Sequence, residues 1–584
     1  MPDPDRFNDA FDDTLSVDSD RYDVTWTSEK SFHGRFERGV IGMQRLFRWP
    51  LLLGIFAIIA VELVLYFTLR GLISVWESLA ALLWDPYARE LKELGESQSY
   101  QEWLQKAKEL DSSMDYDFYR ALDRSPFYAW KTVKNMTYHL VKCCNAINNE
   151  PTTAALTELE TFLSRAYNAN AAGLGVDNER LYAETFTGTK LVLQEYVDTT
   201  LSATKLYLSC ASELVSPATK LNFVRKSRAA YGRTALCLSS GGTMAYYHFG
   251  VVRALHGVKQ LPNIICGSSG GALIAALVGT RTDEELDEML HSGFYSKMRC
   301  CNEGWSTLFR RYVSTGRVFD ENKWRDSLRM IMFNEMTFLE AFQKTGRVLN
   351  ITCTSDNKWG APIVLNYLTA PNVVIWCSVL ASSAVPPLLP PIQLLSKNSK
   401  GRLKAFVDFG KCWSDGCIKN DIPSKQLAEQ FNVNYFIVSQ VNPHIVPFVY
   451  ECRGSGGCPT RRRFSGLRGG FLSSALEALL KLEMRKWLRM VNELDLMPLL
   501  FSQDWSSLFL QKHWGNVTIY PSRGWSAVRD FTKVITDPDE PRMVQYLARG
   551  EKATYPKIAM ISNHLGFEQI LLQAEADLLK QLNL

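Results

Sequence analysis

The sequence lacks an excess of charge of one sign. Its 584 residues include 65 lysines and arginines against 61 aspartates and glutamates, which leaves a formal net charge of +4. A nucleic-acid-binding surface usually needs a clear basic excess. We therefore expect no nucleic-acid partner. With 46% hydrophobic and 22% charged residues, the composition is that of a globular protein.

The 13 cysteines lack the spacing of a metal site or a disulfide framework. No Cys-x-x-Cys pair occurs, and the two adjacent doublets, Cys143-Cys144 and Cys300-Cys301, are not spaced as ligands. Histidine, aspartate and cysteine do not gather at ligand spacing elsewhere. We expect no metal, no organic cofactor and reduced thiols in a cytosol-facing protein.

The N-terminal region also lacks the apolar stretch of a cleavable signal peptide. Its first 33 residues are polar and rich in aspartate. Such a composition cannot bury enough apolar surface to fold. We expect residues 1–48 to be disordered.

One long apolar run differs from the otherwise globular composition of the chain. Residues 51–69 hold a single charge, Glu62, and the run is just long enough to cross a bilayer. A second apolar run, residues 71–84, follows without a polar loop, so 49–84 is predicted to be a membrane-embedded segment. Arginines before it favour a cytosolic N-terminus. Three arrangements are open: a single crossing, a hairpin dipping into one leaflet, or a buried soluble helix. We favour the hairpin, which keeps both ends cytosolic.

The remaining chain divides into three parts. Residues 85–228 show apolar side chains at helical spacing throughout and are predicted to be a helical domain without chemistry of its own. Residues 229–430 alternate β-branched runs with helical runs, which predicts a three-layered α/β domain with a parallel sheet. Residues 431–584 extend that domain and include an amphipathic helix after the Gly/Arg-rich loop 453–470; it either lies on a membrane surface or packs on the core. The expected strands are 235–239, 263–266, 348–353, 405–409 and 435–441.

The strongest motif is Gly267-Ser268-Ser269-Gly270-Gly271. It follows an expected strand and opens a helix of small residues, which is the context of a nucleophile elbow. Glycines two before and two after Ser269 leave room for the tight turn and for close helix-strand packing. The helix N-terminus supplies positive potential for an oxyanion. We expect Ser269 to be a nucleophile, with Gly267 and Gly271 shaping the elbow.

Two further motifs belong with it. Gly241 and Gly242 follow the first expected strand, where bare backbone N–H groups can stabilise an anion. Asp415, beside Gly416 after the expected strand 405–409, can approach a serine hydroxyl as a general base. A structural turn is the alternative role for Asp415. Asp408 and Asp421 are nearby competitors, and Asp421 is expected to cap a helix before Pro423.

In this order the three motifs resemble the patatin-like phospholipase family, over roughly residues 235–430. The helical block before it, and the segments 503–505 and 516–521 after it, resemble the fungal triacylglycerol lipase branch. The resemblance implies a Ser269–Asp415 dyad without histidine and an oxyanion loop at Gly241 and Gly242. The chain departs from the family pattern in two places: a third glycine is missing from the oxyanion loop, and Cys417 follows Asp415-Gly416.

The resemblance implies a lipid hydrolase that cleaves long-chain acyl esters, triacylglycerol or phospholipid, through an acyl-enzyme. Three alternatives are open: an α/β-hydrolase triad using a histidine after Asp415, a lipid-surface scaffold with a decayed site, and an acyltransferase using the same dyad. The histidines available to a triad are His444, His513 and His564.

The expected partner is the membrane of the endoplasmic reticulum or a lipid-droplet surface, with the catalytic domain in the cytosol. The sequence does not indicate a protein partner. Three sequons, at Asn135, Asn350 and Asn516, can report the side of the membrane. Because Asn350 and Asn516 fall in strand-like runs, where a glycan would disrupt the sheet, we expect none to be glycosylated.

Overall fold

The computed structural model describes residues 33–584, except for several internal segments and the last two residues. By their internal contacts the described residues divide into two units, 1–61 and 62–584, each described by itself. Disorder was predicted for residues 1–48: residues 1–32 lie outside the described residues, whereas residues 33–48 are helical, which differs from the prediction. The gaps are 85, 170–172, 292–302, 333–334, 356–362, 387, 450–453, 460–470, 495, 498–507, 509, 522–528 and 583–584.

The apolar segment forms part of one long helix. Helix α1 runs from His33 to Trp84 without interruption, and its Arg48–Trp76 part is long and apolar enough to cross a membrane. The predicted hairpin is wrong, because a hairpin needs a turn near Gly71 and the backbone there is helical. Only Arg70 separates the two apolar runs, without a polar loop, and the helix continues from one run to the other.

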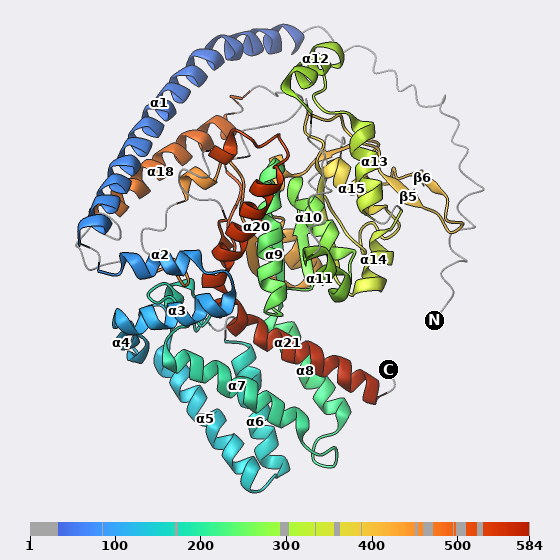
Figure 1. Ribbon diagram of the computed structural model, residues 1–584. Helices are drawn as coiled ribbons and strands as arrows, with labels where there is room; N and C mark the ends of the chain where they lie inside the picture. Colours follow the sequence, from blue (N-terminus) through green and yellow to red (C-terminus); the bar gives the residue numbers. More distant parts are fainter. Residues whose placement is uncertain are drawn as a thin grey trace. The chain divides into compact units, whose positions relative to one another are not determined.

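The helical domain precedes the sheet domain, as predicted. Helices α5 to α8 bury a common apolar core, α2 and α3 pack into a smaller one, and serine or threonine N-caps at Ser99, Thr152 and Ser216 accept backbone N–H groups of the first turns. The C-terminal helix α21 packs against α7 and α8 (Figure 1), so residues from both ends of the chain build this layer. The elements are α2 Ala88–Glu96, α3 Tyr100–Ser113, α4 Asp117–Ala121, α5 Trp130–Asn149, α6 Thr153–Tyr167, η2 Glu179–Tyr182, α7 Leu191–Ser209, α8 Pro217–Tyr231 and α21 Ile558–Gln581.

The sheet has seven strands in the order β4-β3-β2-β1-β8-β9, with β7 also paired to β3. Strands β3, β2, β1, β8 and β9 are parallel, while β4 and β7 run antiparallel to β3. The strands are β1 Arg233–Leu238, β2 Ile264–Gly267, β3 Val348–Ser355, β4 Ile363–Leu365, β7 Trp413–Asp415, β8 Val433–Ser439 and β9 Val517–Ile519.

Both faces of the sheet are covered, which confirms the three-layered α/β class. Along β1, Ala235 and Cys237 pack into the core beneath α17, whereas Leu236 and Leu238 belong to the larger core on the other face. Helices α10 and α15 pack on that second face, against β2 and β3 (Figure 1). The helices and 3-10 turns between the strands are η3 Gly242–Tyr246, α9 Tyr247–Gly257, α10 Gly270–Gly279, α11 Asp283–His291, α12 Trp305–Thr315, α13 Glu321–Ile331, α14 Phe338–Thr345, α15 Ile375–Ser382, α16 Cys417–Asn420 and α17 Ser424–Phe431.

One predicted strand is wrong. Residues 405–409 are not in the main sheet: β6, Leu403–Ala405, ends there and pairs only with β5, Leu395–Lys397, as a small hairpin. Val407 and Phe409 are exposed, and only Phe406 of this apolar run packs into the core. The strand that leads into the predicted base is the later β7. Apolar composition alone could not separate a hairpin arm from a core strand.

The C-terminal part adds strands and helices to the sheet domain. Helix α20, Glu540–Thr554, crosses α9 at close range because two glycines meet there. A Cβ on Gly250 would lie 2.0 Å from the Leu547 carbonyl oxygen, and one on Gly550 would lie 2.3 Å from that of Tyr247. The other elements are η5 Val446–Phe448, α18 Phe471–Glu493 and η7 Tyr555–Lys557.

Candidate active site

Ser269 lies in the sharp turn between β2 and α10. Its backbone angles, φ 51° and ψ −121°, are strained for a residue with a side chain. The flanking glycines allow the turn: a Cβ on Gly267 would lie 2.4 Å from the Gly271 carbonyl oxygen, and one on Gly271 would lie 2.3 Å from that of Leu238. The Ser269 N–H donates to the Ser382 hydroxyl at 2.9 Å. This is the geometry of a nucleophile elbow.

The predicted oxyanion loop lies directly against this turn. A Cβ on Gly270 would stand 2.5 Å from the Gly242 carbonyl oxygen, so the two loops touch through bare backbone. Gly242 has φ 57°, and a Cβ there would lie 2.4 Å from the Val534 carbonyl oxygen. The N–H groups of Gly241 and Gly242 come at the start of the 3-10 helix η3, where intrahelical acceptors do not reach. These donors can therefore serve an anion near Ser269.

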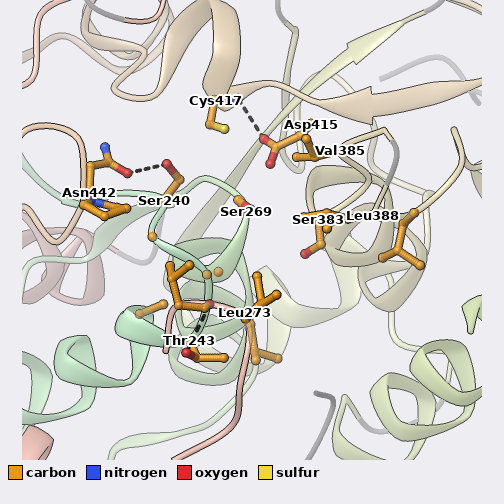
Figure 2. Close-up of a pocket in the computed structure, with 18 of the residues that line it drawn as sticks. Ser240, Thr243, Ser269, Leu273, Ser383, Val385, Leu388, Asp415, Cys417 and Asn442 are labelled. Atoms are coloured by element: carbon orange, nitrogen blue, oxygen red, sulfur yellow. Dashed lines mark hydrogen bonds between the residues drawn. The ribbon is translucent and has the colours of Figure 1, made fainter. Parts of the chain in front are cut away.

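Asp415 ends β7, where it pairs with Cys353 of β3, and its side chain is 1% exposed. One carboxylate oxygen, Oδ1, accepts the Cys417 N–H at 2.8 Å. The other, Oδ2, is buried and makes no hydrogen bond of normal geometry to the described residues. Figure 2 shows the carboxylate on the Ser269 side of this strand. Asp415 thus occupies a strand end instead of the predicted loop.

The electrostatics of Asp415 suit a base that works near neutral pH. Burial raises the pKa of Asp415 to about 7, although the Cys417 N–H and the nearby Ser269 hydroxyl act in the opposite direction. A carboxyl group with a pKa close to the working pH is about half ionised there, so a carboxylate is available that still accepts a proton readily.

A cavity of about 380 Å³ opens at these residues. Ser269 and Asp415 line one part of it (Figure 2), together with Gly241 and Gly242. Apolar side chains form most of the remaining wall. The sequence alone does not predict that residues of the α13 region line this cavity. The main apolar lining residues are Leu273, Ile274, Phe319, Trp324, Leu328, Val379, Leu388 and Leu389.

The three candidate triad histidines take different positions. His444 lines the cavity, and its ring lies 5.5 Å from that of His513. Burial, and then His513, lowers the pKa of His444 to about 3. His564 lies in α21, where its Nδ1 is 2.8 Å from Asp177, and it does not line the cavity. The Ser269 hydroxyl lies close enough to Asp415 to lower the pKa of that carboxyl.

The two competing aspartates also differ from each other. Asp408 is exposed in the segment after β6. Asp421 is buried and is not the cap of α17, whose N-cap residue is Pro423; this prediction is wrong. The short α16 places the Asp421 side chain beneath the oxyanion loop instead.

Sequence reasoning also missed a buried histidine beside the loop. His248 of α9 joins two strand ends: its Nδ1 lies 2.7 Å from the Ser439 hydroxyl and its Nε2 3.0 Å from the Ser239 carbonyl oxygen. Burial lowers its pKa to about 4, so the ring is neutral at pH 7. The sequence of α9 does not indicate this role, because Ser439 is distant in sequence and Ser239 lies outside the helix.

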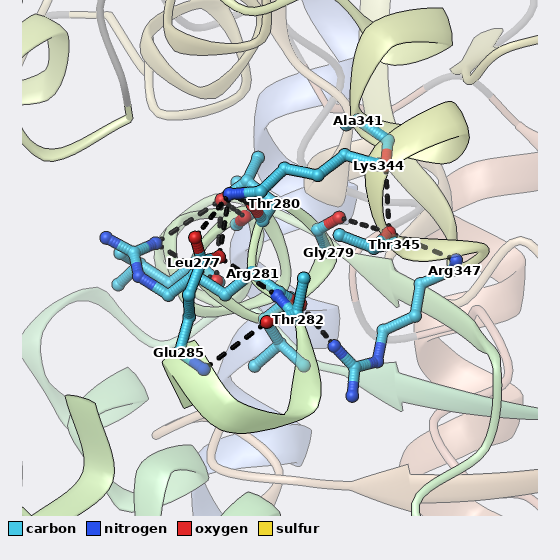
Figure 3. A network of polar contacts seen from close by, with 12 residues as sticks. Leu277, Gly279, Thr280, Arg281, Thr282, Glu285, Ala341, Lys344, Thr345 and Arg347 are labelled. Carbon is cyan, nitrogen blue, oxygen red and sulfur yellow. Dashed lines mark hydrogen bonds and ion pairs between the residues drawn. The ribbon is translucent and has the colours of Figure 1, made fainter. Parts of the chain in front are cut away.

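A polar network holds the C-terminal end of α10, the helix that follows Ser269 (Figure 3). Arg281, which is 6% exposed, donates to the carbonyl oxygens of Leu277 and Ile331, both at 3.1 Å. Lys344 donates to the Thr280 carbonyl at 3.3 Å and pairs with Glu285 at 2.7 Å. Cations at a helix C-terminus satisfy its last carbonyls and oppose its dipole. The network therefore fixes α10, and with it the turn at Ser269.

The described residues contain no group of three or more His, Cys, Asp or Glu side chains placed to hold a metal ion.

A mainly parallel sheet with a strained Gly-x-Ser-x-Gly turn between strand and helix is the framework of serine hydrolases of the α/β class. The particular family follows from sequence comparison. The patatin-like phospholipase family matches residues 236–428, and a domain of unknown function (DUF3336) matches residues 84–229. The chain belongs to the patatin-like phospholipase domain-containing proteins, which confirms the resemblance.

Its relatives include fungal proteins of similar organisation. A patatin-like phospholipase domain-containing protein of Neosartorya fischeri is 41% identical over 90% of this chain and 74% of its own length. One of Aspergillus fumigatus matches with the same identity and coverage. Among solved structures, VipD from Legionella pneumophila aligns with 57% of this chain and 67% of that chain, at 12% identity and a TM-score of 0.28.

Proposed function

We propose that this protein hydrolyses acyl esters of lipids, with Ser269 as the nucleophile, Asp415 as its base and the N–H groups of Gly241 and Gly242 as the oxyanion hole. One observation carries the proposal: a serine in a strained elbow lies next to a buried carboxylate whose pKa is raised to about 7, at the floor of an apolar cavity. Membership of the family supports lipid ester hydrolysis as the class of reaction.

The geometry allows a two-step reaction. Asp415 takes the proton of the Ser269 hydroxyl as its oxygen bonds to the ester carbonyl carbon, and the charge that develops on the carbonyl oxygen faces the two glycine N–H groups. The bond to the alcohol then breaks, and the alcohol oxygen takes the proton from Asp415. Water repeats the sequence on the acyl-serine: it gives a proton to Asp415, bonds to the acyl carbon and releases the fatty acid. Ser269 regains its proton.

The cavity favours a neutral lipid ester over one with an anionic headgroup. Its described lining contains Asp415 and Asp537 but neither lysine nor arginine. A phosphate group in a protein site is usually met by such cations or by several backbone donors. Apolar walls such as Phe319, Trp324 and Leu328 suit an acyl chain. Triacylglycerol is therefore the substrate we favour, with phospholipid as the alternative.

We further propose that the protein works at the endoplasmic reticulum membrane or a lipid-droplet surface, with its sheet domain in the cytosol. Glu62, the single charge of the apolar run 51–69, accepts the Trp487 indole N–H of α18 at 3.1 Å. Tyr66 packs on Phe448, their ring centroids 5.5 Å apart. A helix paired in this way with the catalytic unit suits attachment along one leaflet better than an isolated crossing.

The outer face of α18 supports the same attachment. Leu476, Leu479 and Leu482 are exposed, whereas Met484 and Val491 on the opposite face are buried. Exposed apolar side chains on two neighbouring helices need a lipid or protein covering. The ten cysteines in the described part of the chain are all free, which suits a reducing compartment.

Product analysis tests the proposal. Purified full-length protein in mixed micelles would be given radiolabelled triacylglycerol or phosphatidylcholine, and fatty acid and acyl-transfer products would be separated. We expect fatty acid release, mainly from triacylglycerol, to fall at least about 10³-fold in Ser269→Ala and in Asp415→Asn. Asp408→Asn, at an exposed aspartate outside the site, is the matched control and should behave as wild type.

Three outcomes would contradict parts of the proposal. Full release by Ser269→Ala would exclude the nucleophile. Wild-type turnover by Asp415→Asn together with an inactive His444→Ala would exclude the dyad in favour of a histidine base. Labelled acyl groups found on an added alcohol acceptor, without fatty acid, would identify a transferase.

A further inference from the structure

A second buried carboxylate lies in the site without belonging to the dyad. Asp421, 2% exposed, follows α16 and meets two donors with its two oxygens. Its Oδ1 accepts the backbone N–H of Ser240 at 2.9 Å, and its Oδ2 accepts the Asn442 side-chain amide at 2.7 Å. Ser240 immediately precedes the two oxyanion glycines.

These contacts close into a ring. The Ser240 hydroxyl donates to the Asn442 Oδ1 at 2.5 Å, as Figure 2 shows, and Asn442 in turn donates to Asp421. The ring joins three segments that are far apart in sequence: the loop after β1, the turn after α16 and the loop after β8. Because every donor in the ring has one acceptor, each segment fixes the other two.

The backbone of Asp421 extends the connection to the nucleophile and the base. Its carbonyl oxygen accepts the hydroxyl of Ser268, the neighbour of Ser269, at 2.6 Å. Its N–H donates to the Gln511 Oε1 at 2.7 Å, and the amide of the same glutamine donates to the Cys417 carbonyl at 2.9 Å. Asp421 thus contacts the oxyanion loop and the elbow directly and is connected to the turn after Asp415 through Gln511.

We infer that Asp421 is a positioning residue, which holds the Ser240–Gly242 loop in the position where its N–H groups can donate to the oxyanion. The inference rests on the proposed function. A carboxylate is required because two donors, the Ser240 N–H and the Asn442 amide, converge on it. An asparagine offers one acceptor oxygen only, and its own NH₂ group would face a donor. The loop would then shift, and a displacement of about 1 Å at reacting groups costs about 10²-fold in rate.

The charge of Asp421 also reaches the base. Burial raises the pKa of Asp421 to about 6, so it is mainly ionised at pH 7. The titratable groups that face it are Asp415, Cys417 and Cys266, and its charge raises the pKa of each of them. Removing that charge lowers the pKa of Asp415, so the acid limb of the activity profile moves to lower pH.

The test compares Asp421→Asn with wild type and with the control Asp408→Asn, using full-length protein and a soluble short-chain ester. We expect kcat to fall about 10²-fold in Asp421→Asn, with KM within threefold of wild type and with an acid limb shifted downward. A purely structural role would lower the melting temperature and the amount of active enzyme but would leave kcat per active site, titrated with a fluorophosphonate, unchanged; that result overturns the inference.

A second variant protects the test against misfolding. Asn442→Ala keeps the carboxylate but removes its amide partner and the acceptor of the Ser240 hydroxyl. We therefore expect kcat to fall in this variant too, but less than in Asp421→Asn. Wild-type kcat in both variants, beside an inactive Ser269→Ala, means that the inference fails while the proposed function holds. An active Ser269→Ala means that the proposed function itself fails.

Discussion

The glycine at position 242 allows a direct test of the oxyanion loop. Its φ of 57° costs an alanine about 1–2 kcal/mol. The new Cβ would also lie 2.4 Å from the Val534 carbonyl oxygen, about 1 Å short of an ordinary contact. That oxygen cannot withdraw freely, because the Thr243 N–H holds it at 2.9 Å and the Thr243 hydroxyl at 3.1 Å. Gly242→Ala must therefore displace the loop itself.

A displaced loop removes at least one donor from the developing oxyanion. Loss of one such donor costs about 10²–10³-fold in kcat, so we expect that decrease for a soluble ester substrate, with a circular dichroism spectrum like that of wild type. Gly257→Ala at the end of α9 is the control, since its Cβ would meet no atom within 4 Å. If Gly242→Ala keeps kcat within threefold of wild type, the N–H groups of this loop do not form the oxyanion hole.

The remaining predictions concern pH and the membrane. Because Asp415 must be ionised to act as a base and burial raises its pKa to about 7, kcat/KM should rise with pH through about 7; a profile flat from pH 5 to 8 would exclude it as the base. Deletion of residues 49–84 should release the protein into the soluble fraction while short-ester hydrolysis continues, and a folded, soluble but inactive product would mean that this segment helps to build the site. Asn135 is exposed on α5 and Asn350 is fully buried, whereas Asn516 is exposed but its Oδ1 accepts the Phe436 N–H at 3.0 Å, so Asn135 is the best reporter of the lumen. We expect no glycosidase-sensitive mobility shift in the native protein, and a shift that Asn135→Gln abolishes would place the catalytic domain in the lumen.

The parts of the site that the sequence predicted best are those defined by local order. The elbow at Ser269 needs only a strand, a turn with glycines at fixed positions and a helix, all within about fifteen residues. The order of the glycine pair, the serine and the aspartate then led to the family, and the fold class followed from the alternation of strands and helices. The assignments of Ser269, Asp415, Gly241 and Gly242 stay predictions until variants are measured.

Contacts between distant segments could not be predicted in the same way. The apolar residues at 405–409 read as a core strand, although only the tertiary structure shows that β7 pairs with β3 and that Val407 stays exposed. The continuous helix α1 was mistaken for a hairpin because apolar composition is the same in both. Helix α21 joins the helical domain from the other end of the chain, which no local pattern indicates.

The two aspartates of the site show why residue roles are harder to predict than motifs. Asp415 and Asp421 lie six positions apart, both next to turn-forming residues. Sequence reasoning separated them by their C-terminal neighbours, a glycine directly after the first and a proline two residues after the second. Burial raises the pKa of both aspartates. Their partners differ. Both oxygens of Asp421 accept hydrogen bonds from fixed donors, which is the arrangement that orients a loop. Asp415 has one oxygen held by the Cys417 N–H and one directed into the site, which is the arrangement that a base requires.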